Sequence, residues 1–302
     1  DNYKIHITAT NGGPDDYSDD YFSIIPPIDI RITEIMYNPP NYDEYYEFVE
    51  FYNNGEGTVN LLDWEITEGV SFTFPEHLLA PGEYVVVSAN TDEFLALFGV
   101  DSYQFSGGLS NGGEDIELTD NNGQVRAYVD YDDGGDWYPV TDGEGPSLTY
   151  CDMALDNNDP ASWSVSTYLA AINEDEGMYC TPGMGCNENP ALPVWYDGGW
   201  NGISSNLVIE DRMMLEDLFA PAYKNFIIML GQQGIFWPGQ NINTIGEWDT
   251  YQGYKAKFDG DTYFVFPGQY PETRDVVLQP GTYFIPVLSE GPVSVEDVIM
   301  PL

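Results

Sequence analysis

The sequence predicts an all-β protein with a few helical turns, and two observations carry that prediction. Apolar and polar side chains alternate with a period of two in YKIHITAT, DIRITEIMYN, YEFVEFYNN, EYVVVSAN, EDIELT and SLTYC, which is the pattern of strands that bury one face. Asn-Gly, Asp-Gly, Gly-Gly or Pro-Gly pairs close these stretches and favour tight turns. The clearest hairpin is LTDNNGQVRAYV, in which Asn122 and Gly123 form the turn.

Helical periodicity is rare, and it predicts one or two short helices. NTDEFLALFG offers a helix with Asn90 or Thr91 as its N-cap and Gly99 as its end. The stretch IEDRMMLEDLFAPAYKNFIIML offers a second helical region, which Pro221 divides.

Charge narrows the range of partners. The 302 residues include 8 Lys and Arg against 51 Asp and Glu, so the formal net charge is −43. Such a field repels nucleic acid and anionic headgroups and concentrates cations, which makes Ca²⁺ a candidate cofactor. No stretch has the roughly 20 apolar residues of a membrane helix, so we expect no membrane insertion. The 15% aromatic content argues against a disordered acidic chain.

Prolines mark the expected domain boundaries. SIIPPID separates the opening strands from the rest of the chain. We expect residues 1–25 to be the terminal strands of a preceding β-sandwich domain because they are too few to fold alone. CNENPALPV has the composition of a linker. The division is therefore a β domain over residues 29–187 and a smaller β-rich domain over residues 192–302, within a piece of a longer exported chain.

Three cysteines, Cys151, Cys180 and Cys186, allow one disulfide and one thiol. Their spacing is not that of a zinc site. Either Cys180 and Cys186 close a short loop, or one of them pairs with Cys151.

A family resemblance covers about half of the chain. RITEIMYNPP, YEFVEFYNNGEGTVNLLDWEIT, FTFPEHLLAPGEYVVVSAN and FSGGLSNGGEDIELTDNNG occur in an order that resembles the bacterial lamin-tail domain, from about Asp29 to Cys186. This resemblance implies an immunoglobulin-like β-sandwich that serves as a non-catalytic accessory module of secreted or cell-surface proteins. It also implies a disulfide between Cys151 and Cys186, and it leaves Cys180 unexplained. The last domain resembles a region of unknown activity that follows such modules in exported proteins.

Acidic residues on neighbouring predicted strands are the first candidate site. Alternation along YEFVEF places Glu47 and Glu50 on opposite faces, and the strand that carries Glu34 should bring this residue close to one of them. We expect the carboxylates of this stretch to face water or a cation. Two close carboxylates also permit glycoside hydrolysis. A histidine-containing triad is not expected, because His6 and His77 lie in different predicted domains.

Acidic loops are the candidate calcium ligands. Alternating Asp and Asn on glycine-rich turns can supply the six to eight oxygens that Ca²⁺ prefers, although such residues also form turns without metal. No EF-hand spacing is present. The predicted metal ligands are Asp130, Asp132, Asp133, Asp136, Asp152, Asp156, Asn158, Asp159, Glu34 and Glu47.

Aromatic rings beside amides in the last domain suggest a second kind of site. Trp237, Trp248 and Tyr251 lie in FWPGQNINTIGEWDTYQGY, a composition that suits stacking on sugars, while packing in the core is the alternative. We therefore expect a non-catalytic extracellular module with structural, adhesive or display roles, stabilised by Ca²⁺. The alternatives are a glycan-binding accessory module and a carboxylate-pair hydrolase. The expected partners are other domains of the same chain, surface proteins or glycans, and self-assembly is left open.

Overall fold

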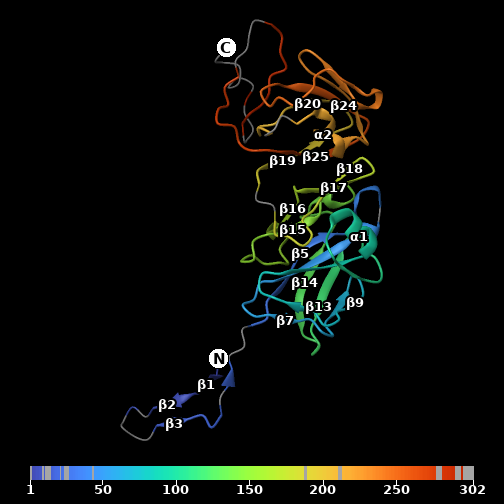
Figure 1. The fold of residues 1–302 in the computed structure, drawn as a ribbon. Coiled ribbons are helices and arrows are strands. Elements are labelled where there is room, and N and C mark those ends of the chain that lie inside the picture. The colour runs from blue at the N-terminus through green and yellow to red at the C-terminus, as the bar shows by residue number, and fades with distance from the viewer. Residues whose placement is uncertain are drawn as a thin grey trace.

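The computed structural model describes residues 2–8, 10, 15–20, 22–23, 27–42, 44–186, 189–209, 213–276, 281–289 and 294. Along the chain they form an N-terminal hairpin, a β-sandwich and a C-terminal β-rich domain (Figure 1). The all-β prediction is confirmed.

The N-terminal hairpin consists of two short ladders. Strand β1 (Asn2–Tyr3) pairs with β4 (Phe22–Ser23), and β2 (His6–Ile7) pairs with β3 (Asp16–Tyr17). The hairpin extends away from the sandwich (Figure 1). Its large apolar side chains Tyr3, Ile5, Ile7 and Tyr17 are all exposed. That residues 1–25 complete a preceding domain stays a prediction.

Two sheets face each other in the sandwich. The first has the order β12 (Tyr103–Gln104), β11 (Tyr84–Ser88), β6 (Phe48–Asn53), β5 (Ile30–Met36), β15 (Leu148–Tyr150) and β16 (Trp163–Val165). The second has the order β14 (Val125–Tyr131), β13 (Glu114–Thr119), β8 (Glu65–Glu68) and β9 (Phe72–Thr73). Neighbours are antiparallel except β11 and β12. Strands β7 (Val59–Asn60) and β10 (Leu78–Leu79) form a separate pair.

Both faces of the six-stranded sheet are covered. Val49 points into the core between the sheets, whereas Phe48 points outward into a second apolar layer. That layer is completed by helix α1 (Thr91–Phe98) and by the hairpin of β17 (Leu169–Asn173) and β18 (Glu176–Tyr179). As predicted, the side chain of Asn90 caps α1, and Gly99 ends it in a left-handed conformation.

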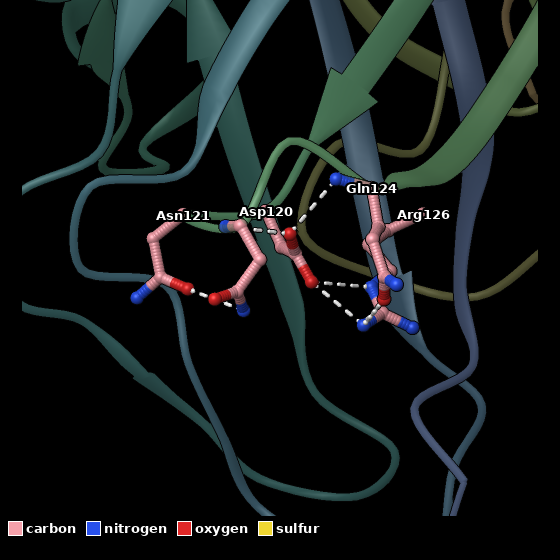
Figure 2. Close-up of polar contacts among 5 residues, drawn as sticks. Asp120, Asn121, Gln124 and Arg126 are labelled. Carbon is pink, nitrogen blue, oxygen red and sulfur yellow. Dashed lines mark hydrogen bonds and ion pairs between the residues drawn. The ribbon is translucent and has the colours of Figure 1, made fainter.

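The β13–β14 hairpin is held by one buried aspartate. One carboxylate oxygen of Asp120 accepts hydrogen bonds from the backbone N–H groups of Asn122 and Gln124, and the other accepts two from the guanidinium of Arg126 (Figure 2). These bonds hold the pKa of Asp120 at about 2, below its ordinary value. The predicted turn at Asn122 and Gly123 is confirmed.

The C-terminal domain packs a five-stranded sheet against a two-stranded ladder. The sheet has the order β20 (Gly199–Ile203), β24 (Tyr254–Phe258), β21 (Phe226–Leu230), β22 (Ile235–Trp237) and β23 (Ile242–Asn243), and the ladder joins β19 (Ala191–Tyr196) to β25 (Thr262–Pro267). Phe219 lies at the centre of an aromatic core and contacts Phe226, Trp248 and Phe264.

The prediction of a second helical region is mostly wrong. Only α2 (Leu215–Leu218) is α-helical there, and Phe226–Leu230 forms strand β21 between β24 and β22. Pro221 interrupts the helical pattern, and the apolar run after it satisfies its backbone groups in the sheet. Short 3-10 turns occupy Pro40–Tyr42, Glu44–Tyr46, Pro139–Thr141, Pro160–Ser162, Ala220–Ala222 and Pro238–Gln240.

The sandwich and the C-terminal domain touch through β18. The rings of Tyr179 and Tyr263 meet edge to face, with centroids 5.4 Å apart. The ammonium of Lys224 lies 2.8 Å from a carboxylate oxygen of Glu176 and donates to the side-chain oxygen of Asn41 over 3.1 Å. These contacts form the junction between the two domains.

Candidate functional site

The structure brings Glu34 and Glu50 together as an acid pair. The two residues are cross-strand partners on β5 and β6, beside a register shift between Ile32 and Glu34. Both are 1% exposed. The expectation that Glu34 lies near one of the two glutamates of the neighbouring strand is therefore confirmed for Glu50.

The acid pair binds the main chain of residues 180–186, which we name the closing segment. Glu34 accepts hydrogen bonds from the hydroxyl of Ser147 and from both the backbone N–H and the hydroxyl of Thr181. Glu50 accepts from the hydroxyl of Thr33 and, over 2.7 Å, from the backbone N–H of Gly183. Because an unpaired buried carboxylate is costly, these donors are what allow the pair to lie inside the protein.

A disulfide fastens the same segment. Cys186 pairs with Cys151 across 35 residues of sequence, which confirms the pairing implied by the family resemblance. Cys180 is free and buried in the outer apolar layer. Burial, together with the nearby Glu34 and Glu50, raises the pKa of its thiol well above the ordinary value.

The space beside the acid pair is small. A cavity of about 50 Å³ touches Glu50, Thr33, Tyr84 and the disulfide. It has room for roughly one or two water molecules. A sugar ring does not fit there, so the arrangement of Glu34 and Glu50 offers no place for a glycoside between them.

The expectation that the carboxylates of this stretch face water or a cation is wrong for Glu47 and Glu50. Glu47 is 2% exposed and accepts a 2.8 Å hydrogen bond from the backbone N–H of Leu109. The reason is that other segments of the chain cover the carboxylates of both residues. The backbone N–H groups of these segments need hydrogen-bond acceptors because they are shielded from water. Glu34 and Glu47, two of the predicted calcium ligands, thus bind main-chain and hydroxyl groups.

Burial dominates the protonation of these glutamates. Desolvation raises the pKa of Glu34 to about 7 and that of Glu47 to about 7, although their hydrogen bonds act in the opposite direction. The pKa of Glu50 is raised well above its ordinary value, first by desolvation and then by the charge of Glu34. The folded protein therefore retains protons on this region at pH values where exposed glutamates are ionised.

Four of the predicted calcium-binding aspartates shape turns. The carboxylates of Asp132, Asp152, Asp156 and Asp159 each accept a hydrogen bond from the backbone N–H two residues later. Among the other candidates, Asp130, Asp136 and Asn158 are exposed and Asp133 is half-buried. Within the described residues, no three or more His, Cys, Asp or Glu side chains gather in a way that could hold a metal ion. The calcium site stays a prediction.

The three aromatic candidates, Trp237, Trp248 and Tyr251, lie in different environments in the structure. Trp248 is 5% exposed and belongs to the core, where its ring nitrogen donates to the hydroxyl of Thr250, so its predicted role as a stacking surface is wrong. Trp237 is 38% exposed. Tyr251 lines a cavity of about 820 Å³ between the loop 244–254, the turn 232–234, residues 273–276 and residues 283–284.

The sequence predicts Tyr251 as a site residue but does not predict the polar residues that line this cavity. Gln232, Asp249 and Gln252 line it together with Tyr251 and Tyr283. The stretch EWDTYQGY, in which aromatic rings stand beside amide and acidic side chains, is the local sequence signal for this cavity. Apart from Thr244 and Ile245, the remaining walls come from segments more than ten residues away in the chain.

Comparison with known proteins supports the resemblance. Residues 26–133 match the family model of the Lamin Tail Domain, which spans most of the sandwich. No curated protein matches the chain significantly. Within the described residues, no helix has the length and apolar character needed to cross a membrane. The disulfide between Cys151 and Cys186 indicates an oxidising environment.

We expect the buried glutamates to make stability depend on pH. Their pKa values in the folded state exceed the ordinary 4.5, so their contribution is fully present below about pH 4.5 and is lost as the pH rises through about 7. The free energy of unfolding in urea should fall over this range in the wild type and fall less in Glu34→Gln. The exposed Glu76 gives a matched control, Glu76→Gln, which should follow the wild type. Parallel profiles for Glu34→Gln and the wild type would contradict this account.

Removing the disulfide should destabilise the sandwich by about 3–4 kcal/mol, because it closes a loop of 35 residues. The variant carrying Cys151→Ala and Cys186→Ala should show this loss in urea unfolding. A reductant should lower the stability of the wild type and leave the double variant unchanged. Equal sensitivity of both proteins to the reductant would argue against the pairing.

The calcium prediction is tested by chelation. If Ca²⁺ links the acidic loops, EDTA lowers the melting temperature and excess Ca²⁺ restores it. Asp156→Asn should then reduce the effect of Ca²⁺, whereas Glu76→Asn should not. A melting curve that EDTA leaves unchanged contradicts the calcium prediction.

Proposed function

We propose that this chain, whose residues 26–133 match the family model of the Lamin Tail Domain, is a non-catalytic module of a larger bacterial secreted or cell-surface protein. Its lamin-tail sandwich supports and displays the C-terminal domain. The observation that carries this proposal is that the acid pair holds the closing segment. Glu34 and Glu50, the carboxylates best placed to react, are buried and occupied by the closing segment.

An extracellular setting is supported by the disulfide and by the charge of −43. A structural disulfide persists in oxidising compartments, and strong net charge keeps an exported protein dissolved. Ca²⁺ remains part of the proposal as a stabiliser of the acidic loops, subject to the chelation test.

The hydrolase alternative has little support in the geometry. General acid and nucleophile must both reach the glycosidic bond, whereas Glu34 and Glu50 are each 1% exposed and the cavity that Glu50 lines has a volume of about 50 Å³. The direct test is to incubate the full chain with glycoside, ester and peptide substrates. We expect no turnover, and turnover that disappears in Glu50→Gln would overturn the proposal.

Display requires a fixed relation between the two domains, and Lys224 lies at their junction. Its ammonium contacts Glu176 and Asn41, and its backbone N–H donates to the carbonyl of Asp175. The side chain of Lys224 is 46% exposed, so removing its charge alone should cost little. Reversing the charge places a carboxylate beside Glu176 and Glu144, which repel it.

We therefore expect Lys224→Glu to loosen the junction. Small-angle X-ray scattering should show a larger maximum dimension for this variant than for the wild type, and the difference should shrink at high salt. The matched control is Lys255→Glu, because the ammonium of Lys255 lies over the ring of Trp200 and away from the junction. Identical scattering for Lys224→Glu and the wild type would show that the contacts at Lys224 do not hold the domains together.

A further inference from the structure

A large cavity lies within the C-terminal domain. Its volume is about 820 Å³, which is within the range of small-molecule sites. The turn 232–234 between β21 and β22 forms one side, and the loop 244–254 between β23 and β24 forms another. Residues 273–276 and 283–284 complete the walls.

The last wall is fastened to the others by hydrogen bonds. The backbone N–H of Gly253 donates to the carbonyl of Phe284 over 3.0 Å, and the side-chain amide of Gln232 donates to the carbonyl of Thr282. The hydroxyl of Tyr251 donates to the carbonyl of Thr273 over 3.2 Å. A side chain at Gly253 would lie 2.9 Å from backbone atoms of residues 284 and 285, so only glycine allows this close approach.

Polar groups are held in place on these walls. The two carboxylate oxygens of Asp249 accept from the backbone N–H of Tyr251 and from the side-chain amide of Gln252. The backbone N–H of Asp249 donates to the hydroxyl of the buried Tyr254. These bonds fix the orientation of Asp249 and Gln252 before any ligand arrives, which lowers the entropic cost of binding.

The composition of the walls selects the class of ligand. The residues lining the cavity include the amides of Gln232, Gln233 and Gln252 and the carboxylates of Glu247, Asp249 and Asp275. Among the described residues that line the cavity, none is Lys, Arg or His. An anionic ligand would therefore meet carboxylates without a compensating cation. Phosphorylated, sulfated and uronic-acid glycans are poor candidates for this reason.

A neutral carbohydrate fits the remaining chemistry. Its hydroxyl groups can donate to carboxylates and accept from amides, and the C–H face of a sugar ring can pack on the aromatic ring of Tyr251. We propose that this cavity binds a neutral glycan, with Tyr251 as the stacking ring and Asp249 and Gln252 as hydroxyl-binding groups. The inference rests on the proposed display function, since it names what the displayed domain binds.

The test uses the full chain on an array of neutral glucans, mannans, galactans and xylans, with heparin, pectin and spermine as charged probes. At least one neutral class should be retained. In titration calorimetry with that glycan, Tyr251→Ala should weaken binding roughly tenfold, as expected for losing one ring contact. Gln252→Ala should weaken it as well. Thermal melting of each variant checks that the domain remains folded.

Trp237→Ala is the matched control, because Trp237 is an exposed ring of the same domain that does not line the cavity. It should leave the affinity unchanged. Tyr251→Phe keeps the ring but removes the hydrogen bond to Thr273, so it should bind better than Tyr251→Ala.

Three results would overturn the inference: no neutral glycan retained, retention that Tyr251→Ala does not change, or binding of spermine alone. These results are independent of the scattering of Lys224→Glu and of the turnover assay. A failure of the glycan inference can therefore be distinguished from a failure of the proposed display function.

Discussion

The need to satisfy backbone groups on the outer face of the six-stranded sheet governs much of this structure. That face is covered by α1, by the β17–β18 hairpin and by the closing segment, so the N–H groups of Thr181 and Gly183 require acceptors away from bulk water. Glu34 and Glu50 supply them. Two adjacent buried carboxylates are unfavourable in isolation, and their raised pKa values reflect this. The hydrogen bonds and the disulfide offset that cost, and together they fix the closing segment in a single conformation.

The position of the C-terminal domain follows from the same constraint. The backbone of β18 leads directly into the closing segment, and its Tyr179 forms the ring contact with Tyr263. Glu176 at the start of β18 is the partner of Lys224. Fixing the closing segment therefore fixes the strand on which the second domain rests. In this arrangement Glu34 and Glu50 hold the closing segment, and the cavity proposed to bind a glycan lies in the other domain.

Much of the fold could be predicted from the sequence, because local patterns determine it. Alternation located the main strands, Asn90 and Gly99 bounded α1, and Asn122 with Gly123 formed the expected turn. The burial of Glu50 could not be predicted in this way, since its partner Gly183 is 133 residues away. A signal did exist, because Phe48 and Val49 are both apolar and the sheet is covered on both sides. The strand Phe226–Leu230 and the burial of Trp248 likewise depend on distant neighbours.

The scarcity of cations connects the two proposals. Among the described residues, Arg31 pairs with Asp29, Arg126 with Asp120 and Lys224 with Glu176, so these scarce basic residues lie at structural points. A fourth, Lys255, lies over the ring of Trp200. Of the cavity-lining residues that the structure describes, none is basic. Recognition there must depend on hydrogen bonds and ring contacts, which salt screens weakly, whereas the contact of Lys224 at the junction is electrostatic and half-exposed. Binding and domain arrangement should therefore respond differently to ionic strength, because they rest on different physical interactions.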